Sequence, residues 1–315
     1  MKKIVVIGGG TGLSSMLMGM KKIQDVALTA IVTVADDGGS TGRIRDTYNI
    51  PAVGDIRHVL YAMAQDENEN LFRELLNYRF QGNEDVGGHN LGNLIFLALI
   101  DITGSFIGAI QALSQVLNIK GRIVPSTLDN VTLYAMMKDG TKVRGEKNIP
   151  IVCNSIDRVF YQDKVVAYPQ AIKAIEEADL IIYGIGSLYT SILPNLIIEP
   201  ICKSIQNNPC PKIYFCNAMS QPGETDGYSV EDHIRAIEKH SFMNSVDVAI
   251  VNESYIPKTI LERYAKENSS PVRLKETIHS YAIIKRNLIK FDTQGRIRHD
   301  ANAVKEIIEE LINQL

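Results

Sequence analysis

The chain has 315 residues, which is more than one compact core usually serves, so its length indicates either one large domain with insertions or two lobes. With 45% hydrophobic residues, 22% charged residues and a formal net charge of −3, it has the composition of a globular protein and no basic footprint for nucleic acid or acidic lipid. No apolar run is long enough to insert into a membrane or to form a signal peptide, so we expect a cytoplasmic protein.

Apolar runs alternate with segments of helical period along most of the chain. This alternation is typical of βαβ units and predicts an α/β fold with a mostly parallel sheet and helices on both faces. Strands are expected at 3–7, 28–34, 180–183, 212–216 and 246–251, and helices at 13–22, 171–177, 229–240, 257–267 and 301–315. Without an internal repeat or a flexible linker, residues 1–315 are expected to form a single large domain.

Two insertions interrupt this alternation. Helices are expected in succession at 55–65, 69–78, 90–100 and 104–117, which makes a helical insertion of about 55–118. Strands are then expected at 121–124, 131–137, 141–144 and 156–161, which makes a small β-rich insertion of about 120–162. Asp139-Gly140, between two of these strands, is a strong signal for a hairpin turn.

The first strand leads directly into a glycine-rich turn, since residues 4–15 read IVVIGGGTGLSS. Glycine lacks a Cβ, so backbone N–H groups can approach an anion there, and the following helix points its positive end at the same place. Leu13 replaces the third glycine of a dinucleotide fingerprint, and no Gly-Lys-Ser/Thr of a P-loop follows. We predict that this turn binds phosphate or a nucleotide, and the alternative is a merely tight turn. The candidate residues are Gly9, Gly10, Thr11, Gly12 and Leu13.

The second strand ends in the residues ADDGGSTGR, at 35–43. An acidic side chain at this place often hydrogen-bonds a ribose hydroxyl in doubly wound folds. Paired carboxylates beside glycine and hydroxyl residues also suit a metal-assisted phosphate site, because hard cations prefer carboxylate and phosphate oxygens. The candidates are Asp36, Asp37, Gly38, Ser40 and Arg43, and the alternative is a solvated turn.

Two of the expected inserted helices begin with further candidates. Asp55 stands where it serves either as an N-cap or as a site residue close to Asp37 and Arg43. Residues 86–96 read VGGHNLGNLIF, which again places glycines before a helix. Asn90 and Asn93 in this stretch offer polar groups to a base, a sugar or a phosphate.

The second half of the chain repeats the order of strand, glycine turn and helix. Residues 182–196 read IYGIGSLYTSILPNL and offer Gly184, Gly186 and Ser187, although the G-x-S-x-G of a hydrolase nucleophile is missing. The loop after the next strand offers Asn217. Ligands of open α/β sheets bind along the carboxyl ends of the strands, so we expect these loops to converge on one extended, phosphorylated ligand.

The stretches GGGTGLS, TVADDGGSTGR, GDIR, HNLGN, GSLYTSILPN and QPGETDGY resemble, in this order, the 2-phospho-L-lactate transferase-like (CofD-like) family and most closely its gluconeogenesis factor branch. The resemblance implies a Rossmann-like core, usually homodimeric, that binds a nucleotide-linked ligand. The transferase branch passes a guanosine-linked phospholactate to a deazaflavin acceptor with magnesium. The factor branch is described as binding UDP-sugars such as UDP-N-acetylglucosamine and as supporting cell shape and cell-wall synthesis during gluconeogenic growth.

The resemblance also implies roles for particular residues. Asp37 and Asp55 match the transferase carboxylates that handle metal and phosphate, so they would be the metal ligands and catalytic residues of a transferase. The stretch 184–194 matches its phosphate-gripping loop. Two positions depart from the family, since Ile185 stands where the factor branch has proline and Asn90 stands where a serine is frequent.

Two functions from different classes remain open. The leading hypothesis is a non-catalytic, UDP-sugar-binding regulatory protein with cell-wall synthesis or regulatory proteins as partners. In it the first turn and Gly186-Ser187 hold the diphosphate, Asp36 or Asp37 holds the ribose or a bridging Mg²⁺, and Asn217 meets the base or sugar. The alternative is a magnesium-dependent transferase of a nucleotide-linked phospho group. NAD-dependent oxidoreduction is the weakest reading, because no residue resembles a hydride-site acid or base.

Overall fold

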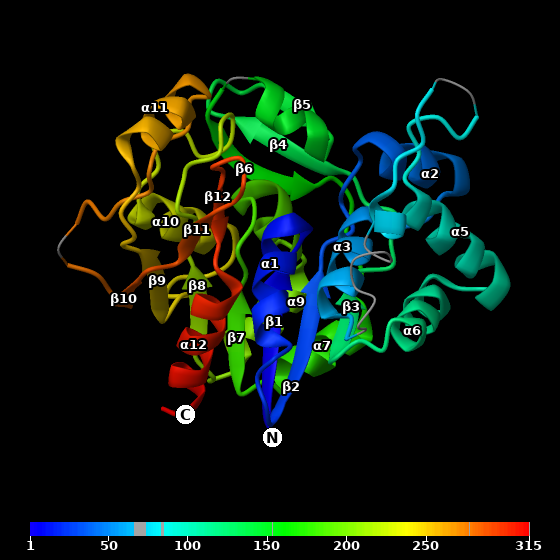
Figure 1. Cartoon of the computed structure of the whole chain (residues 1–315), viewed down its shortest axis with the longest axis horizontal. Helices are drawn as coiled ribbons and strands as arrows, with labels where there is room; N and C mark the ends of the chain where they lie inside the picture. The colour runs from blue at the N-terminus through cyan, green and yellow to red at the C-terminus, as the bar shows by residue number, and fades with distance from the viewer. Residues whose placement is uncertain (66–73, 83–84, 153, 277, 315) are drawn as a thin grey trace.

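Seven parallel strands form the central sheet. The computed structural model describes residues 1–65, 74–82, 85–152, 154–276 and 278–314. The strands are β1 (Lys2–Gly8), β2 (Val26–Val32), β3 (Arg122–Pro125), β7 (Leu180–Tyr183), β8 (Lys212–Phe215), β9 (Val248–Asn252) and β10 (Ala282–Arg286), in the order β3-β2-β1-β7-β8-β9-β10. All neighbouring pairs are parallel. With helices on both faces (Figure 1), this confirms the predicted Rossmann-like α/β class.

The strand order reverses between β1 and β7. From β1 the chain moves outward through β2 to β3, and it then returns to the other side of β1 and continues from β7 to β10. The ends of β1 and β7 are in register, since Ile7 pairs with Tyr183 and the N–H of Gly184 donates to the Ile7 carbonyl at 2.8 Å. Such a reversal is the place at which open α/β sheets bind ligands at their carboxyl edge.

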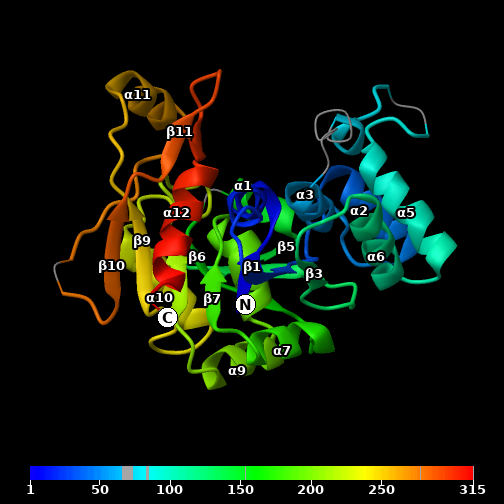
Figure 2. The ribbon, with the colours of Figure 1, turned by 60° about the horizontal axis from the view of Figure 1, so that its bottom comes forward.

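Helices cover both faces of the sheet. α1 (Gly10–Met20) packs against α3 (Gly54–Met63) and α12 (Ala301–Ile312) on one face, and α7 (Pro169–Glu176) and α9 (Glu199–Asn207) lie together on the other (Figure 2). Because both faces are covered, Ile4, Val5, Val6 and Ile7 are all buried. This burial explains why β1 is a continuous apolar run rather than an alternating one.

Part of the expected helical insertion lies beyond the β3 edge of the sheet, as α5 (Leu91–Thr103) and α6 (Phe106–Val116) (Figure 1). Most of the helix expected at 69–78 falls at 66–73, outside the described residues. The stretch that was expected to be a loop at 36–43 instead leads into α2 (Gly39–Tyr48). Within the described ranges, no single helix is long and apolar enough to cross a membrane, and only α5 and α6 together, bent by 114°, pass that test of length and composition.

A small antiparallel sheet stands beyond the carboxyl edge of the main sheet (Figure 1). It consists of β4 (Leu133–Met137), β5 (Lys142–Arg144) and β6 (Ile156–Tyr161) in the order β5-β4-β6. The turn at Asp139-Gly140 joins β4 to β5 as expected, and the 3₁₀ segment η1 (Glu146–Val152) follows β5. The strand expected at 121–124 is β3, which pairs with β2 in the main sheet.

The last part of the chain returns to α1. β11 (Ile289–Phe291) and β12 (Ile297–His299) form an antiparallel hairpin, and α12 follows. A Cβ at Gly19 would collide with the carbonyl of Ala301, so only glycine lets the start of α12 lie directly on α1. This contact places the hairpin beside the first turn of α1.

Candidate functional site

The two glycine turns that follow β1 and β7 touch each other. A Cβ at Gly12 would lie 2.5 Å from the carbonyl oxygen of Ile185 and 2.8 Å from Cα of Gly186. In the other direction, a Cβ at Gly186 would lie 3.3 Å from the Gly9 carbonyl oxygen. Because these glycines have no side chains, the N-terminus of α1 and the second turn come together at the switch point, the place between β1 and β7 where the strand order reverses.

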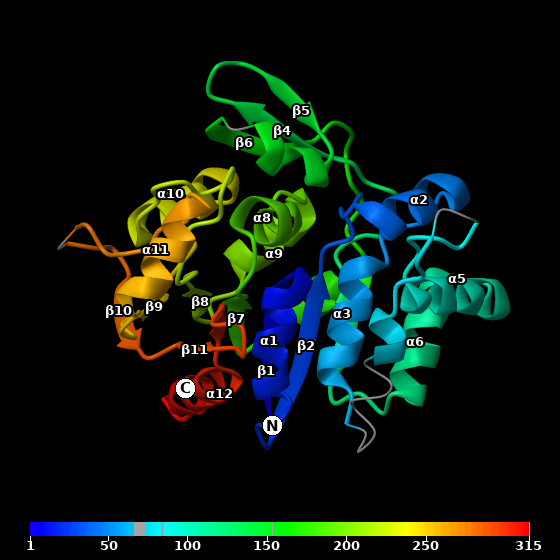
Figure 3. The same cartoon turned by 45° about the horizontal axis from the view of Figure 1, so that its top comes forward.

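A cavity of about 610 Å³ opens beside these turns, and we call it the acidic cavity. Figure 3 shows how α1, the small sheet and β11 are arranged. Residues of α1, η1 and the C-terminal hairpin are among those that line the cavity. Of the residues predicted from the sequence, Gly9, Gly10, Thr11, Gly12, Asp36, Asp55, Gly186, Ser187 and Asn217 line it. Thr190, Gln221 and Glu224, which also line it, lie on the second glycine turn and on the loop after β8 that the sequence indicated. Glu146, Glu267, Arg298 and His299 are lining residues that no sequence motif indicated.

Asp55 and Asp36 form one wall of the acidic cavity. Asp55 lies in the first turn of α3 against Gly9, and it accepts a hydrogen bond from the Gly10 N–H. Asp36 accepts from the Gly38 N–H at 2.8 Å. Burial raises the pKa of Asp55 to about 7, and the nearby Asp36 charge adds to this effect; burial also raises the pKa of Asp36. Two half-buried carboxylates thus line one cavity.

Glu146 and Glu224 bring two more carboxyl groups into the cavity from different elements. Glu146 begins η1, and burial together with the charges of Asp36 and Asp55 raises its pKa to about 8. Glu224 lies on the loop after β8, and burial raises its pKa to about 7. The Ser187 hydroxyl donates to Glu224, and the Thr190 hydroxyl donates to Ser187 Oγ at 2.7 Å. The chain therefore holds a partly buried serine–glutamate pair at the second turn.

The second turn continues into an unusual helical segment, the π-helix η2 (Leu188–Ile192), which α8 (Leu193–Leu196) extends. Ser187 caps η2 by accepting from the Thr190 N–H at 3.0 Å. Asn217 donates to the Gly186 carbonyl at 2.8 Å, so the loop after β8 is tied to the same turn. Single π turns within helices are frequent at functional sites, and here one places Ser187 and Thr190 on the cavity wall.

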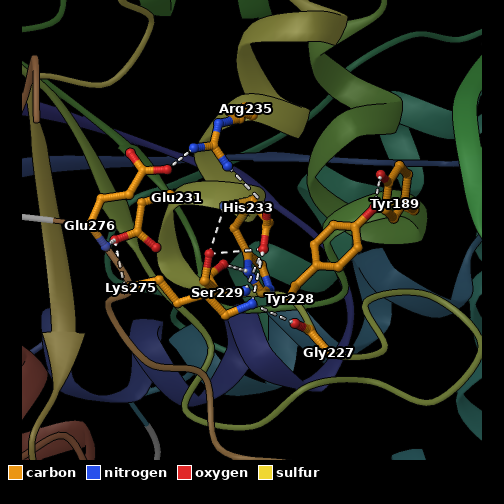
Figure 4. A network of polar contacts seen from close by, with 10 residues as sticks. Tyr189, Gly227, Tyr228, Ser229, Glu231, His233, Arg235, Lys275 and Glu276 are labelled. Atoms are coloured by element: carbon orange, nitrogen blue, oxygen red, sulfur yellow. Dashed lines mark hydrogen bonds and ion pairs between the residues drawn. The ribbon is translucent and has the colours of Figure 1, made fainter.

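A polar network connects the end of the loop after β8 to α10 and to residues 275–276 (Figure 4). Ser229 and Asp232 form a capping box at the start of α10 (Val230–His240). Glu231 accepts from the N–H groups of Lys275 and Glu276 at 2.9 and 3.0 Å. At the other end of the network, the hydroxyls of Tyr228 and Tyr189 lie 2.8 Å apart, which joins this loop to η2.

Five predicted residues lie outside the lining of the acidic cavity. Ser40 faces the start of α5, where its Oγ accepts from the Asn90 N–H at 3.1 Å and from Asn93 Nδ2 at 3.2 Å. Arg43 donates to the Gly87 carbonyl at 2.9 Å. Asp37 turns toward the small sheet and accepts from the Lys147 N–H at 3.0 Å. The carboxylate that shares the cavity with Asp55 is therefore that of Asp36, not Asp37.

The remaining predicted residues, Leu13, Gly38 and Gly184, pack against or precede the turns and do not line the cavity. Leu13 is fully buried, and a Cβ at Gly184 would lie 3.0 Å from Leu13 Cδ1, so these two residues pack the turns together. Gly38 is the N-cap residue of α2, and its N–H binds Asp36. Glu146 gave no sequence signal, because it follows no strand of the main sheet. Glu224 lies on the loop after β8, one of the loops at the carboxyl ends of strands that the sequence indicated.

The charge of the acidic cavity is strongly unbalanced. Among the described residues that line it, five are carboxylates and one is a cation, Arg298. No cluster of three or more candidate ligand side chains occurs in the described part of the chain. Mg²⁺ commonly needs only one or two protein carboxylates, because phosphate oxygens and water complete its coordination. The half-buried pair of Asp36 and Asp55, which offers only oxygen ligands, fits such a cation.

By these features, the protein belongs to the class of doubly wound α/β proteins that have a cavity at the switch point of the sheet. The chain belongs to the family described as 2-phospho-L-lactate transferase CofD, whose model matches residues 4–289. The match confirms the resemblance inferred from the sequence motifs.

Full-length relatives place the chain in the gluconeogenesis factor branch of this family. It is 42% identical to the gluconeogenesis factor of Halalkalibacterium halodurans, over 98% of this chain and 96% of that protein. It is also 42% identical to the gluconeogenesis factor of Bacillus subtilis, over 99% and 98% of the two chains. A crystal structure of a UPF0052 family member from Bacillus halodurans superposes with a TM-score of 0.92 at 41% identity, covering 98% of this chain and 99% of that one.

Proposed function

We propose that the protein binds a UDP-sugar, such as UDP-N-acetylglucosamine, in the acidic cavity and acts as a regulator rather than an enzyme. The observation that carries this proposal is the contact between Gly12 and the turn at Ile185-Gly186, which brings the N-terminus of α1 and the second glycine turn to one cavity. The name of the curated relatives, gluconeogenesis factor, supports a role during growth on gluconeogenic carbon sources. Support of cell shape and cell-wall synthesis is part of this proposal.

The diphosphate of the ligand would lie across the two turns. The first N–H groups of α1 have no partner within the helix, and the helix dipole favours an anion there. Thr11 and Gly12 of α1 line the cavity together with Gly186, and Arg298 supplies a cation to the same cavity. Asn217, Gln221 and Glu224 offer amide and carboxyl groups to the hydroxyls of a sugar. Homodimer formation also remains part of the proposal.

Asp36 and Asp55 would hold one Mg²⁺ together with the diphosphate. When bound, the cation would neutralise phosphate charge next to the carboxylates. Without a cation, an anionic ligand would meet five carboxylates at short range, and like charges in a buried site repel strongly. We therefore expect nucleotide-sugar affinity to depend on magnesium.

Thermal unfolding with UDP-N-acetylglucosamine, GDP and NAD, each with and without Mg²⁺, tests the proposal. A ligand that binds only the folded state stabilises the protein by about 2.7 kcal/mol when its free concentration is 100 times its Kd. We therefore expect UDP-N-acetylglucosamine with Mg²⁺ to raise Tm by about 5 °C. A rise with GDP and Mg²⁺ but none with the UDP-sugar would reject the proposal.

A second candidate function is magnesium-dependent transfer of a phospho group, and the Ser187–Glu224 pair favours it. A carboxylate whose pKa is about 7 can accept a proton at neutral pH. The oxygen of an acceptor hydroxyl would attack phosphorus, its proton would pass to Glu224, and the bond to the nucleotide leaving group would break. Asp36 and Asp55 would hold the cation beside the reacting phosphorus.

Phosphorus NMR of the protein with nucleotide-linked substrate, acceptor alcohol and Mg²⁺ distinguishes the two functions. A transferase would release nucleotide, and Glu224→Gln would abolish the release while changing ligand affinity little. If the protein only binds, the spectrum of the ligand stays unchanged in the wild type as well.

A further inference from the structure

A second cavity of about 590 Å³ lies on the other side of β12, between the C-terminal hairpin, α1 and α3. We call it the basic cavity. Its volume falls in the range of small-molecule sites and exceeds what a bare inorganic ion needs. The basic and acidic cavities share the wall formed by Thr11, Gly12, Ile297, Arg298 and His299.

The basic cavity has the opposite charge to its neighbour. Among its described lining residues, Lys290, Arg296 and Arg298 are cations and Asp292 is the carboxylate. The two arginines share Asp292, at 2.8 and 3.5 Å. Asp292 also accepts from the N–H groups of Gln294 and Arg296, which close the hairpin turn. One carboxylate therefore serves two guanidinium groups and two backbone donors.

Lys290 adds positive charge that this carboxylate does not balance. Its Nζ lies 3.9 Å from Asp300, which is outside the cavity lining and caps α12 by accepting from the Asn302 N–H at 2.9 Å. An exposed ion pair at this separation is weak. The hairpin thus presents more cationic than anionic charge to the cavity.

His58 on α3 is among the residues that line the basic cavity. Its Nε2 lies 2.9 Å from a guanidinium nitrogen of Arg57, and because guanidinium only donates, Nε2 is the acceptor. Burial and the Arg57 charge lower the pKa of His58 to about 4, so the ring is neutral and Nδ1 carries the hydrogen. Nδ1 is buried and has no partner in the described part of the structure, so it needs an acceptor.

We propose that the basic cavity binds a small organic phosphate at a site separate from the nucleotide-sugar site. Its dianionic group lies against Lys290 and Arg296, and the organic part fills the space toward α1 and His58. Because β12 is a wall of both cavities, occupancy of the basic cavity adjusts the position of Arg298 at the acidic cavity. The binding step itself does not depend on the function proposed above.

Calorimetric titration of the full chain in EDTA tests this site, with ribose 5-phosphate and pyrophosphate as the titrants and ribose as the uncharged control. Without a divalent cation the acidic cavity repels both anions, so binding reports the basic cavity. We expect one anion per chain and no binding of ribose. In Lys290→Gln/Arg296→Gln we expect the affinity to fall by about tenfold or more.

The matched control is Arg286→Gln/Lys305→Gln, which removes the same charge at ion pairs with Glu310 and Glu309 away from both cavities. It should change the affinity less than about twofold. Lys290→Gln alone leaves the hairpin pairs of Asp292 intact and should still weaken binding if the double variant fails to fold. Absence of binding by both anions, equal loss in both double variants, or stoichiometric displacement by UDP-N-acetylglucosamine would each overturn the proposal.

Discussion

Gly12 lets the two glycine turns of the site touch, because it has no side chain. Any Cβ at this position would overlap the turn at Ile185-Gly186, although Gly12 itself lies inside the regular helix α1. Helical glycine ordinarily costs stability relative to alanine, so a glycine here indicates a packing requirement.

Gly12→Ala should therefore separate the two turns and destabilise the protein. Overpacking of a close contact costs about 1–3 kcal/mol, which lowers Tm by several degrees, and ligand binding at the acidic cavity should weaken as well. Gly8→Ala is the matched control, because a Cβ there would make ordinary contacts at 3.7 Å with Leu13. Thermal unfolding of both variants measures the difference, and equal Tm values would contradict the assigned contact.

The raised pKa of Glu146 predicts a pH-dependent effect on stability. Its pKa of about 8 in the folded chain exceeds the ordinary 4.5, so the folded state binds more protons than the unfolded chain between these values. The stability from this group is fully present below pH 4.5 and is lost as the pH rises toward 8.

Glu146→Gln should consequently match the wild type at pH 4.5 and exceed its Tm at pH 8.5 by about 2 °C or more. Urea unfolding across this pH range gives the free-energy difference between the two proteins. Glu177→Gln is the control, since Lys3 lowers rather than raises the pKa of that exposed carboxyl group. A gain that is independent of pH would show that the carboxyl charge of Glu146 is not responsible.

Residue types and their order along the chain predicted the glycine turns correctly but could not separate Asp36 from Asp37. Adjacent residues on an extended segment point in opposite directions, and which one faces the cavity depends on Gly54, whose missing Cβ leaves room for the Asp36 carboxylate. Asn90 and Asn93 were predicted as ligand contacts from their residue type and position alone. Both are polar and follow glycines, yet α2 supplies their partner, Ser40.

At the scale of elements, strands and helices with strong apolar periodicity were predicted well. β7 at 180–183 and β6 at 156–161 lie where they were expected. The missed helix α2 begins Gly-Ser-Thr-Gly, which are typical turn residues. A contact distant in sequence accompanies it, since buried Arg45 donates to the Val131 carbonyl at 2.8 Å. The hairpin of β11 and β12 was also missed, because its three-residue strands carry no clear period.

η1 connects the small sheet to the acidic cavity, and Asp37 holds its first residues. The Asp37 carboxylate accepts the Lys147 N–H and lies against Gly145, directly before Glu146. At its other end, η1 meets the loop after β8, where Gly223 lies against the Pro150 carbonyl. Asp37 thus positions Glu146 without lining the cavity itself.

Asp37→Ala should loosen this connection. Loss of a charge-assisted hydrogen bond of this kind corresponds to about tenfold faster amide exchange, which we expect across 145–149. Asp139→Ala is the control, because Asp139 makes the same kind of bond to the Thr141 N–H at the far end of β5. Hydrogen exchange followed by mass spectrometry compares the two, and unchanged exchange in Asp37→Ala would contradict the role assigned to Asp37.

On the scale of the whole molecule, parallel strand ends gather their loops at one edge, which is why the convergence of the two glycine turns was foreseeable. The position of the switch point was not, because strand order depends on how distant segments pair. The small sheet and the C-terminal hairpin then enclose that edge (Figure 3) with side chains that have no local sequence signal. Glu146 and Arg298 reach the cavity in this way.

The acidic cavity also predicts how magnesium affects the stability of the whole chain. Asp55, Glu224 and Glu146, with pKa values of about 7, 7 and 8, are mostly protonated at pH 5.5 and mostly ionised at pH 8.5. Mg²⁺ binds the ionised carboxylates, so it should raise Tm at pH 8.5 by about 2 °C or more and leave it nearly unchanged at pH 5.5. Differential scanning calorimetry with Mg²⁺ and with EDTA measures both. Asp36→Asn/Asp55→Asn should abolish the rise, whereas a rise of equal size in that variant would place the bound cation elsewhere.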